Sequence, residues 1–277
     1  MIISQKILSK DLIKKMTIEV LENMPKVAIL IAVRMKSTRL PRKALTKIED
    51  QTLIEHLIDR VKLVKNANKV ILCTSTHPDD EILLKMAEKK GICAFAGEED
   101  DVMNRFIKAI EKFMPDAGIA VRVTGDNPLT SPHFIDNAII HHQKNDADYT
   151  STQELPQGTK GEIISMQALR KAYKLAEDSN FSEYMTWYFT DNPDQFKIEK
   201  VHIEEDLKRP NYRLTVDNPE DLQLIKAIYK KLYVPGKTIF LKNVIKLLDN
   251  NPLLLEINAK VKSKNIKDTV NVRLKKG

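Results

Sequence analysis

Apolar residues are grouped along this chain in a pattern of alternating strands and helices. The clearest strand is the unbroken apolar run at residues 27–33, which is typical of a strand covered on both faces and is too short for most core helices. Further strand-like runs lie at residues 69–76, 92–95, 119–124, 149–152, 196–203 and 212–216. Helical periodicity or capping residues mark the segments 52–64, 78–91, 101–113, 132–144, 166–177, 181–189 and the segment that begins at 219.

This alternation predicts an α/β fold of three layers, in which a mostly parallel, mixed sheet lies between two layers of helices. Thr52 and Glu55 are spaced as a capping box for one helix, and Asp100 is expected to cap another. Residues 156–161 are expected to form an exposed loop. In a doubly wound sheet of this kind, a ligand binds at the carboxyl ends of the strands.

The two ends of the chain are predicted to lie outside this domain. Residues 1–24 carry apolar positions near the helical period, which indicates an amphipathic helix that ends at Pro25. Residues 257–277 hold seven of the 45 Lys and Arg residues but one of the 38 acids, so the net charge of +7 is mainly a property of the tail. We therefore predict a helical extension at 1–24, one α/β domain at 25–250 and a basic tail at 251–277.

Composition and charge exclude several classes of protein. No apolar run approaches the ~20 residues that span a bilayer, and no basic leader precedes an apolar block. Cys73 and Cys93 lack the spacing of a redox or metal motif, which is typical of reduced, buried thiols. A nucleic-acid enzyme would carry its positive charge on the folded body. We therefore expect a cytoplasmic protein that binds neither membrane nor nucleic acid.

The candidate chemistry begins directly after the first strand, in a loop with five cations and no acid. These cations are Arg34, Lys36, Arg39, Arg42 and Lys43. Ser37 and Thr38 add hydroxyl donors, and Pro41 keeps the residue before it out of helical angles. Positive charge beyond the carboxyl end of a strand suits an anionic ligand. Because the chain contains no glycine-rich phosphate-binding motif, Arg and Lys side chains would have to hold the phosphates.

Two similar stretches, residues 124–128 and 215–219, each place an aspartate just past a predicted strand, Asp126 and Asp217. Two carboxylates suit Mg²⁺, which usually binds one or two protein carboxylates together with the phosphates of a nucleotide. Asp-Asn-Pro is also a common turn, and a third copy at 191–193 follows a helix-like segment without any apparent metal role. Together with the cationic loop, however, the aspartate pair favours Mg²⁺ bound with a triphosphate.

Six short segments occur in a specific order along residues 27–232. They are residues 32–45 (AVRMKSTRLPRKAL), 74–75 (TS), 99–106 (EDDVMNRF), 121–132 (VRVTGDNPLTSP), 182–186 (SEYMT) and 213–222 (RLTVDNPEDL). In this order the chain resembles the cytidylyltransferases of spore-coat-polysaccharide type, which are relatives of the CMP-Kdo and CMP-neuraminate synthetases. The resemblance implies a GT-A-like, Rossmann-like nucleotidyltransferase fold and a homodimer. It also implies a Mg²⁺-dependent transfer of CMP from CTP to a sugar or sugar acid, with release of pyrophosphate, in polysaccharide precursor synthesis.

The resemblance also implies roles for individual residues. The catalytic groups would be Arg34, Lys43 and Asp126, and the metal ligands would be Asp126 and Asp217. The nucleotide would contact Ala32, Val33, Arg34, Ser37, Arg39, Lys43, Thr74, Ser75, Asp101, Arg105 and Thr124. The acceptor would contact Arg122, Gln157, Glu162 and Glu183, and the polar residues of 145–200 are compatible with a sugar acid, a sugar phosphate or a phosphonate.

The sequence departs from the family pattern at three places, and it leaves alternatives open. The family usually has Gly at Arg42, which would either crowd the phosphates or add one more cation, and Cys at Asn127. Glu-Tyr-Met-Thr at 183–186 replaces the more usual Glu-His-Val-Thr, so the chemical identity of the acceptor stays open. The aromatic cluster at 184 and 187–189 is expected in the core or an interface rather than against a sugar.

Two other functions are compatible with the same sheet. A glycosyltransferase of the GT-A type would usually show a D-x-D pair past a strand, and none is found past a predicted strand here. A catalytically inactive nucleotide-binding module would keep the sheet but lose ligands, and only the Gly at position 42 is lost. Both functions remain alternatives to the transferase.

Overall fold

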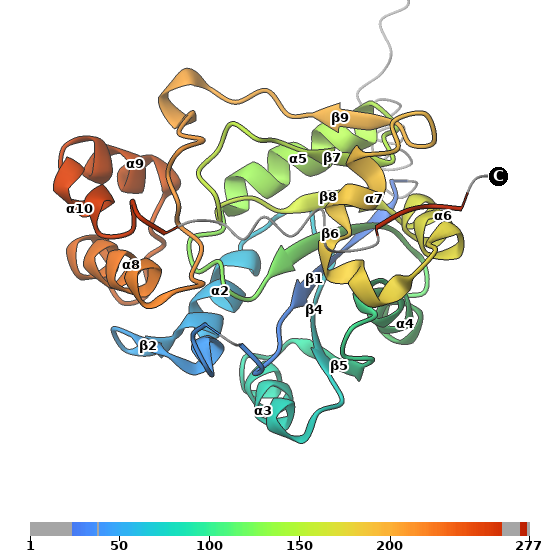
Figure 1. The fold of residues 1–277 in the computed structure, drawn as a ribbon, viewed down its shortest axis with the longest axis horizontal. Helices are drawn as coiled ribbons and strands as arrows, with labels where there is room; N and C mark the ends of the chain where they lie inside the picture. Colours follow the sequence, from blue (N-terminus) through green and yellow to red (C-terminus); the bar gives the residue numbers. More distant parts are fainter. Residues whose placement is uncertain (1–23, 38, 262–271, 276–277) are drawn as a thin grey trace, which may run out of the picture.

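The computed structural model describes residues 24–37, 39–261 and 272–275. A seven-stranded sheet forms the centre (Figure 1), in the order β5-β4-β1-β6-β8-β7-β9. All of these strands run in one direction except β8, which is antiparallel to both of its neighbours. The strands are β1 (Lys26–Ala32), β4 (Lys69–Ser75), β5 (Cys93–Gly97), β6 (Ala117–Thr124), β7 (Tyr149–Ser151), β8 (Glu162–Ser165) and β9 (Ile198–Lys200). The predicted α/β fold with a mostly parallel, mixed sheet is confirmed.

Helices cover both faces of the sheet because alternate residues of each buried strand point to opposite sides. In β1, Val27, Ile29 and Ile31 pack in one apolar cluster with α2 (Leu53–Val61), α3 (Glu81–Lys89) and α5 (Pro132–Lys144). Ala28 and Leu30 pack on the other side, with α4 (Val102–Phe113), α6 (Met166–Leu175) and α7 (Thr186–Thr190). The unbroken apolar run in the sequence thus reflects burial on both faces.

A third apolar cluster lies at one end of the molecule (Figure 1) and joins the last helices to the short ribbon of β2 (Lys47–Ile48) and β3 (Gln51–Thr52). Its helices are α8 (Pro219–Leu232), α9 (Leu241–Asp249) and α10 (Pro252–Glu256). The side chain of Asn258 donates to the carbonyl oxygen of Arg213 at 3.0 Å and to Asp221 at 2.9 Å. Described residues of the predicted tail therefore pack against the segment that carries Asp217.

Local sequence signals account for the helix starts. The capping box is confirmed, because Glu55 accepts from the backbone N–H of Thr52 at 2.9 Å and the Thr52 hydroxyl accepts from that of Glu55. The cap of α4 is Asp101 rather than Asp100, since Asp101 accepts from the backbone N–H of Asn104 at 3.0 Å. The short 3₁₀ helices complete the helical elements; they are η1 (Lys43–Leu45), η2 (Pro78–Asp80), η3 (Ser179–Tyr184) and η4 (Glu205–Leu207).

The second half of the chain departs from the predicted pattern. β8 was not predicted, and residues 212–216 form an isolated bridge between Gln157 and Arg213 instead of a strand. Residues 156–161 are mostly buried rather than exposed. β9 covers only three residues of the run at 196–203. These segments pair with loops as well as with the sheet, so their residue patterns carry a weaker signal of secondary structure.

Three predictions concern the ends of the chain or its surroundings. The predicted N-terminal helix lies outside the described residues, except for Met24, which is not helical. The predicted domain boundaries stay a prediction. Within the described residues, no helix is both long enough and apolar enough to cross a bilayer.

Candidate active site

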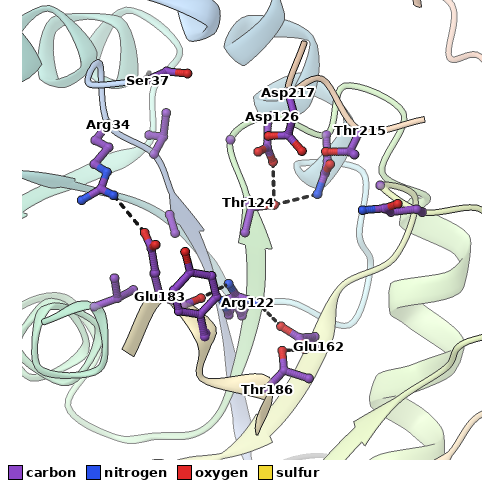
Figure 2. A pocket seen from close by; sticks show the side chains of 18 of the residues that line it. Arg34, Ser37, Arg122, Thr124, Asp126, Glu162, Glu183, Thr186, Thr215 and Asp217 are labelled. Carbon is purple, nitrogen blue, oxygen red and sulfur yellow. Dashed lines mark hydrogen bonds and ion pairs between the residues drawn. The ribbon is translucent and has the colours of Figure 1, made fainter. Parts of the chain in front are cut away.

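A cavity of about 900 Å³ opens at the carboxyl ends of β1 and β6. In β6, Ala120 faces the core, and the next residues on the same side, Arg122 and Thr124, line the cavity instead. Figure 2 shows Asp126 and Asp217 at one end of this pocket and Arg122, Glu162 and Thr186 at the other. The cavity thus lies at the carboxyl ends of the strands, where the sequence predicts the ligand site.

The cationic loop is anchored at its start by a buried aspartate that the sequence analysis did not single out. Asp80 accepts from the backbone N–H of Met35 at 2.7 Å, from the hydroxyl of Thr74 at 2.8 Å and from the backbone N–H of Ser75 at 3.0 Å. Burial opposes the ionisation of Asp80, but these hydrogen bonds outweigh it and lower the pKa of the carboxyl group. Thr74 and Ser75 therefore support the loop through Asp80, and neither lines the cavity.

Arg34, the first residue of the cationic loop, is surrounded by carboxylates. Its guanidinium group lies 2.9 Å from Glu183, 3.3 Å from Asp100 and 3.7 Å from Glu99. Figure 2 shows the ion pair with Glu183 across the pocket. Arg34 thus joins the first strand to η3, and its charge faces the cavity with the partners in place.

Lys43 lies between the two aspartates of the predicted metal site. Its ammonium group donates to Asp126, to Asp217 and to the carbonyl oxygen of Val216, each at 2.9 Å. Burial opposes the charge of Lys43, but the two carboxylates outweigh it and raise the pKa of the lysine. Burial likewise opposes the ionisation of Asp126, and Lys43 outweighs it, so the pKa of Asp126 is lowered. The charged forms of Lys43 and Asp126 therefore stabilise each other.

Asp217 is also held by two arginines. Arg39 lies 3.0 Å from one oxygen of Asp217, and Arg213 lies 2.8 Å from the other. Arg213 is fixed in turn by the buried carboxylate of Asp221 at 2.9 Å and by Gln157 at 3.2 Å. This network brings the cationic loop, the 213–217 segment and α8 to one point, although Asp217 does not follow a strand.

A buried ion pair lies between adjacent strands at the other end of the cavity. Arg122 in β6 is the register partner of Glu162 in β8, and their side chains form an ion pair. The other oxygen of Glu162 accepts from the hydroxyls of Tyr149 and Thr186, and Arg122 also donates to the carbonyl oxygen of Glu183 at 2.7 Å. Burial opposes the ionisation of Glu162, but Arg122 outweighs it and lowers the pKa of the carboxyl group.

Two glycines allow backbone segments to approach closely around the site. A side chain at Gly125 would come within 2.6 Å of Val33, and one at Gly158 would come within 2.5 Å of the backbone of Thr215. Gly158 also has a φ of +90°, which favours glycine. The loop of Asp126 is thereby packed against β1, and the loop at 156–161 is packed against the 213–217 segment.

The structure brings most of the predicted site residues together. Those that line the cavity are Ala32, Val33, Arg34, Ser37, Arg39, Lys43, Arg105, Arg122, Thr124, Asp126, Gln157, Glu162, Glu183 and Asp217. Asp101 does not line it and instead caps α4 and accepts from the hydroxyl of Ser179 at 2.7 Å. Arg42 is exposed and also lies outside the lining, with a left-handed φ of 56°. The position of Arg42 therefore supports neither effect expected of it, crowding of the phosphates or an additional cation at the phosphates.

Several residues of the cavity were not selected from the sequence. Arg213 and Thr215 line it, but both lay within a run that was interpreted as a strand. The aromatic cluster is divided, because Tyr188 and Phe189 are fully buried in the core whereas Tyr184 and Trp187 line the cavity. The rings of Tyr184 and Trp187 are stacked, with centroids 5.3 Å apart. The core prediction is thus confirmed for Tyr188 and Phe189, whereas Tyr184 and Trp187 pack partly buried against the same cluster and also face the cavity.

Asp126 and Asp217 are the donors that suit a divalent cation in this cavity. Their oxygens converge on one point, which the Lys43 ammonium occupies. No group of three or more His, Cys, Asp or Glu side chains suited to a metal occurs within the described ranges. Two carboxylates match Mg²⁺, which takes its other ligands from water and phosphate.

Comparisons with known proteins identify the family and agree with the fold. The model of the cytidylyltransferase family matches residues 28–254. The uncharacterized protein MJ1063 of Methanocaldococcus jannaschii is 34% identical over 243 residues, which cover 88% of this chain and 98% of the relative. The spore coat polysaccharide biosynthesis protein SpsF of Bacillus subtilis is 32% identical over 231 residues, which cover 82% and 95%.

A solved structure of the same family has a similar fold. The structure of a cytidylyltransferase from Leptospira borgpetersenii superposes with a TM-score of 0.77 and 25% identity, covering 87% of this chain and 99% of the other. The nucleotidyltransferase fold implied by the sequence segments is therefore confirmed. Sequence, fold and relatives all show that the chain belongs to the cytidylyltransferase family.

Proposed function

We propose that this protein transfers CMP from CTP to an oxygen atom of a sugar or sugar acid and releases pyrophosphate. The observation that carries the proposal is the position of Lys43 between Asp126 and Asp217, in a cavity that also contains Arg34 and Arg39. Cations beside a carboxylate pair suit a triphosphate that is bound together with a divalent metal. The name of the SpsF relative, which refers to spore coat polysaccharide biosynthesis, supports a sugar acceptor.

The proposed reaction is an in-line displacement at the α-phosphorus of CTP. The acceptor oxygen forms a bond to this phosphorus and loses its proton to solvent, while the bond between the α-phosphorus and the bridging oxygen to the β-phosphate breaks. Pyrophosphate leaves with the bonding electron pair. Arg34, Arg39 and Lys43 would hold phosphate oxygens and offset the negative charge that develops on them. Arg suits bidentate contacts and Lys supplies a point charge.

Mg²⁺ is part of the proposal, with Asp126 and Asp217 as its protein ligands. When bound, it would supply additional positive charge at the phosphates. Thr124 supports this role for Asp126, because its hydroxyl donates to the second carboxylate oxygen at 2.7 Å and leaves the first toward Lys43. Arg213 supports Asp217 in the same way. Both carboxylates are therefore oriented before any ligand binds.

Removal of either carboxylate charge tests the proposal. Asp126→Asn and Asp217→Asn are each expected to lower kcat for CTP-dependent pyrophosphate release on the order of 10²–10³-fold, because the charge that stabilises the transition state is lost. The matched control is Asp191→Asn, which changes the third Asp-Asn-Pro sequence outside the cavity and should retain activity. Circular dichroism verifies that the variants are folded. Full activity of either site variant would contradict the metal role.

Nucleotide binding is tested separately by thermal unfolding. With Mg²⁺ present, CTP is expected to raise the melting temperature more than UTP, ATP or GTP at the same concentration, because a ligand that binds only the folded state stabilises it. A response to none of the four nucleotides would contradict the proposed reaction. An equal response to all four would contradict the choice of CTP.

A further inference from the structure

Eight cationic side chains line the cavity, and two of them differ from the rest. The eight are Arg34, Lys36, Arg39, Lys43, Arg105, Arg122, Lys160 and Arg213. Six of them form an ion pair with at least one carboxylate. Arg105 and Lys160 have no carboxylate within ion-pair distance among the residues that the structure describes. These two positive charges are therefore the ones that the protein itself leaves without a direct counter-charge.

Arg105 and Lys160 differ in their access to the cavity. Arg105 is only 3% exposed, and its guanidinium group donates to the carbonyl oxygens of Glu98 at 2.7 Å and Glu99 at 3.2 Å. Lys160 is half-buried, and its ammonium group donates to the carbonyl oxygen of Thr152 and to the side chain of Gln153. Lys160 is thus the more accessible of the two, and both of its partners are neutral.

The loop that carries Lys160 is held rigidly by its neighbours. The backbone N–H of Gln157 donates to the carbonyl oxygen of Tyr212, and that of Leu214 donates to Gln157, each at 2.8 Å. The carbonyl oxygen of Thr159 accepts from the backbone N–H of Ser131 at 2.7 Å. Gly158 lies directly against Thr215. Lys160 is therefore presented to the cavity from a fixed backbone.

The position of Lys160 separates it from the proposed phosphate site. It precedes β8 by two residues, whereas the cationic loop follows β1. In the sheet, β8 lies two strands away from β1, which corresponds to about 10 Å at the usual strand spacing. Lys160 also lies two residues before Glu162, which lines the cavity together with its ion-pair partner Arg122. It is thus suited to the part of the ligand that is not triphosphate.

We propose that Lys160 binds an anionic group of the acceptor, a carboxylate or a phosphate, and so selects charged over neutral acceptors. This inference rests on the proposed function. Burial lowers the pKa of Lys160, although Glu162 partly offsets it, so the charged form is held at a cost that an anion would relieve. Six of the other cavity cations are paired with carboxylates, and Arg105 is nearly fully buried, so Lys160 is the accessible cation without a direct carboxylate partner.

The test compares Lys160→Met, which removes the charge, with Lys160→Arg, which retains it. Lys174→Met, on the exposed side of α6, is the matched control. Binding is measured by calorimetry to protein saturated with CMP, using 3-deoxy-manno-octulosonate and N-acetylneuraminate as carboxylates, glucose 1-phosphate as a phosphate, and N-acetylmannosamine as the neutral probe. At least one anion is expected to bind the wild type, with at least tenfold weaker binding in Lys160→Met and substantial recovery in Lys160→Arg.

The outcomes separate this inference from the proposed function. The CTP-induced rise in melting temperature should be the same in Lys160→Met and the wild type, whereas a loss of that rise would assign Lys160 to the nucleotide and overturn the inference. Failure of every anion to bind the wild type, or equal binding to the wild type and Lys160→Met, would also overturn it. Absence of any CTP response in the wild type would instead contradict the proposed function. The carboxylate and phosphate probes show which anion is preferred.

Discussion

The cavity contains two cation–carboxylate centres that are built in different ways. At one end, Lys43 joins Asp126 and Asp217, which come from two loops 91 residues apart in sequence. At the other end, Arg122 and Glu162 are register partners on adjacent strands. The first centre is assembled from loops around one ammonium group, with Arg39 and Arg213 also on Asp217, whereas the second is held between paired strands.

The difference lies in what holds each carboxylate. Both oxygens of Glu162 are occupied by neighbours from the sheet and α7, namely Arg122, Tyr149 and Thr186. The carboxylates of the Lys43 centre share an ammonium group that faces the cavity, and their other contacts, from Thr124, Arg39 and Arg213, also come from residues that line the cavity. We therefore assign the Arg122 centre to stability and shape, and the Lys43 centre to the ligand. The following predictions test this division.

The largest expected effect is on stability, at the Arg122 centre. Glu162→Gln leaves the buried Arg122 guanidinium without its counter-charge, which should lower the free energy of unfolding by about 3–5 kcal/mol. Urea denaturation measures this change. The control is Glu154→Gln at an exposed ion pair with Lys208, where the expected loss is below about 1 kcal/mol. Equal losses in the two variants would contradict the division between the centres.

The same variant has a predicted pH dependence. Because the pKa of Glu162 is lower in the folded protein than in the unfolded chain, its contribution is fully present above its ordinary value of 4.5 and is lost as the pH falls toward the folded pKa. The stability difference between the wild type and Glu162→Gln should therefore shrink in acid. Urea titrations at several pH values below neutrality measure it. A difference that grows as the pH falls would mean that the sign is wrong.

An intermediate effect is expected at the Lys43 centre, on metal binding without nucleotide. Lys43→Met removes the ammonium group that competes for the oxygens of Asp126 and Asp217, so Mn²⁺, used as a probe for Mg²⁺, should bind about tenfold more tightly, a change of about 1.4 kcal/mol. Electron paramagnetic resonance of free Mn²⁺ measures this affinity. Lys36→Met, at an exposed cavity lysine paired with Glu99, is the control. Unchanged Mn²⁺ affinity in Lys43→Met would show that the ammonium and the metal do not share a site.

The smallest effect is expected next to Lys43, at the strained residue Arg42. Its left-handed φ of 56° costs a non-glycine residue about 1–2 kcal/mol, and glycine adds about 0.5–1 kcal/mol of backbone entropy in the unfolded chain. Arg42→Gly should therefore stabilise the fold by about 0.5–1 kcal/mol, as measured by urea denaturation. Arg42→Ala retains the strain and should give no such gain. Stabilisation by both variants would point to the charge of Arg42 instead.

The sequence predicted the regular part of the fold well, for physical reasons that are visible in the structure. β1 and β4 are buried on both faces and therefore appear as continuous apolar runs. The helices α2 and α5 carry their own capping residues. β8 was missed because it has only four residues and begins with Glu162. A charged residue at a strand start is expected to be exposed, and its burial here depends on the ion pair with Arg122.

The site was predicted only in part, because only some of its residues lie in recognisable short sequence patterns. The cationic loop and the two aspartates were found because short sequence patterns mark them, although Asp217 reaches Lys43 from a loop rather than from a strand. Thr74 and Ser75 were predicted to contact the nucleotide, but they do not line the cavity and instead support the cationic loop through Asp80. Tyr184 and Trp187 could not be separated from Tyr188 and Phe189 by composition, because all four are aromatic residues of one short segment at the start of α7.

The one antiparallel strand of the seven-stranded sheet has a consequence for the proposed acceptor site. Because β8 runs against its neighbours, the chain enters it from the edge where the ligand site lies, so the loop before it must cross the mouth of the cavity. On the proposed function, substitution of its cavity-lining side chains at Gln157 and Lys160 would alter acceptor binding without disturbing the hydrogen-bonded strands beneath. New specificities could thus arise by exchange of a short segment while the machinery at the end of β1 stays unchanged.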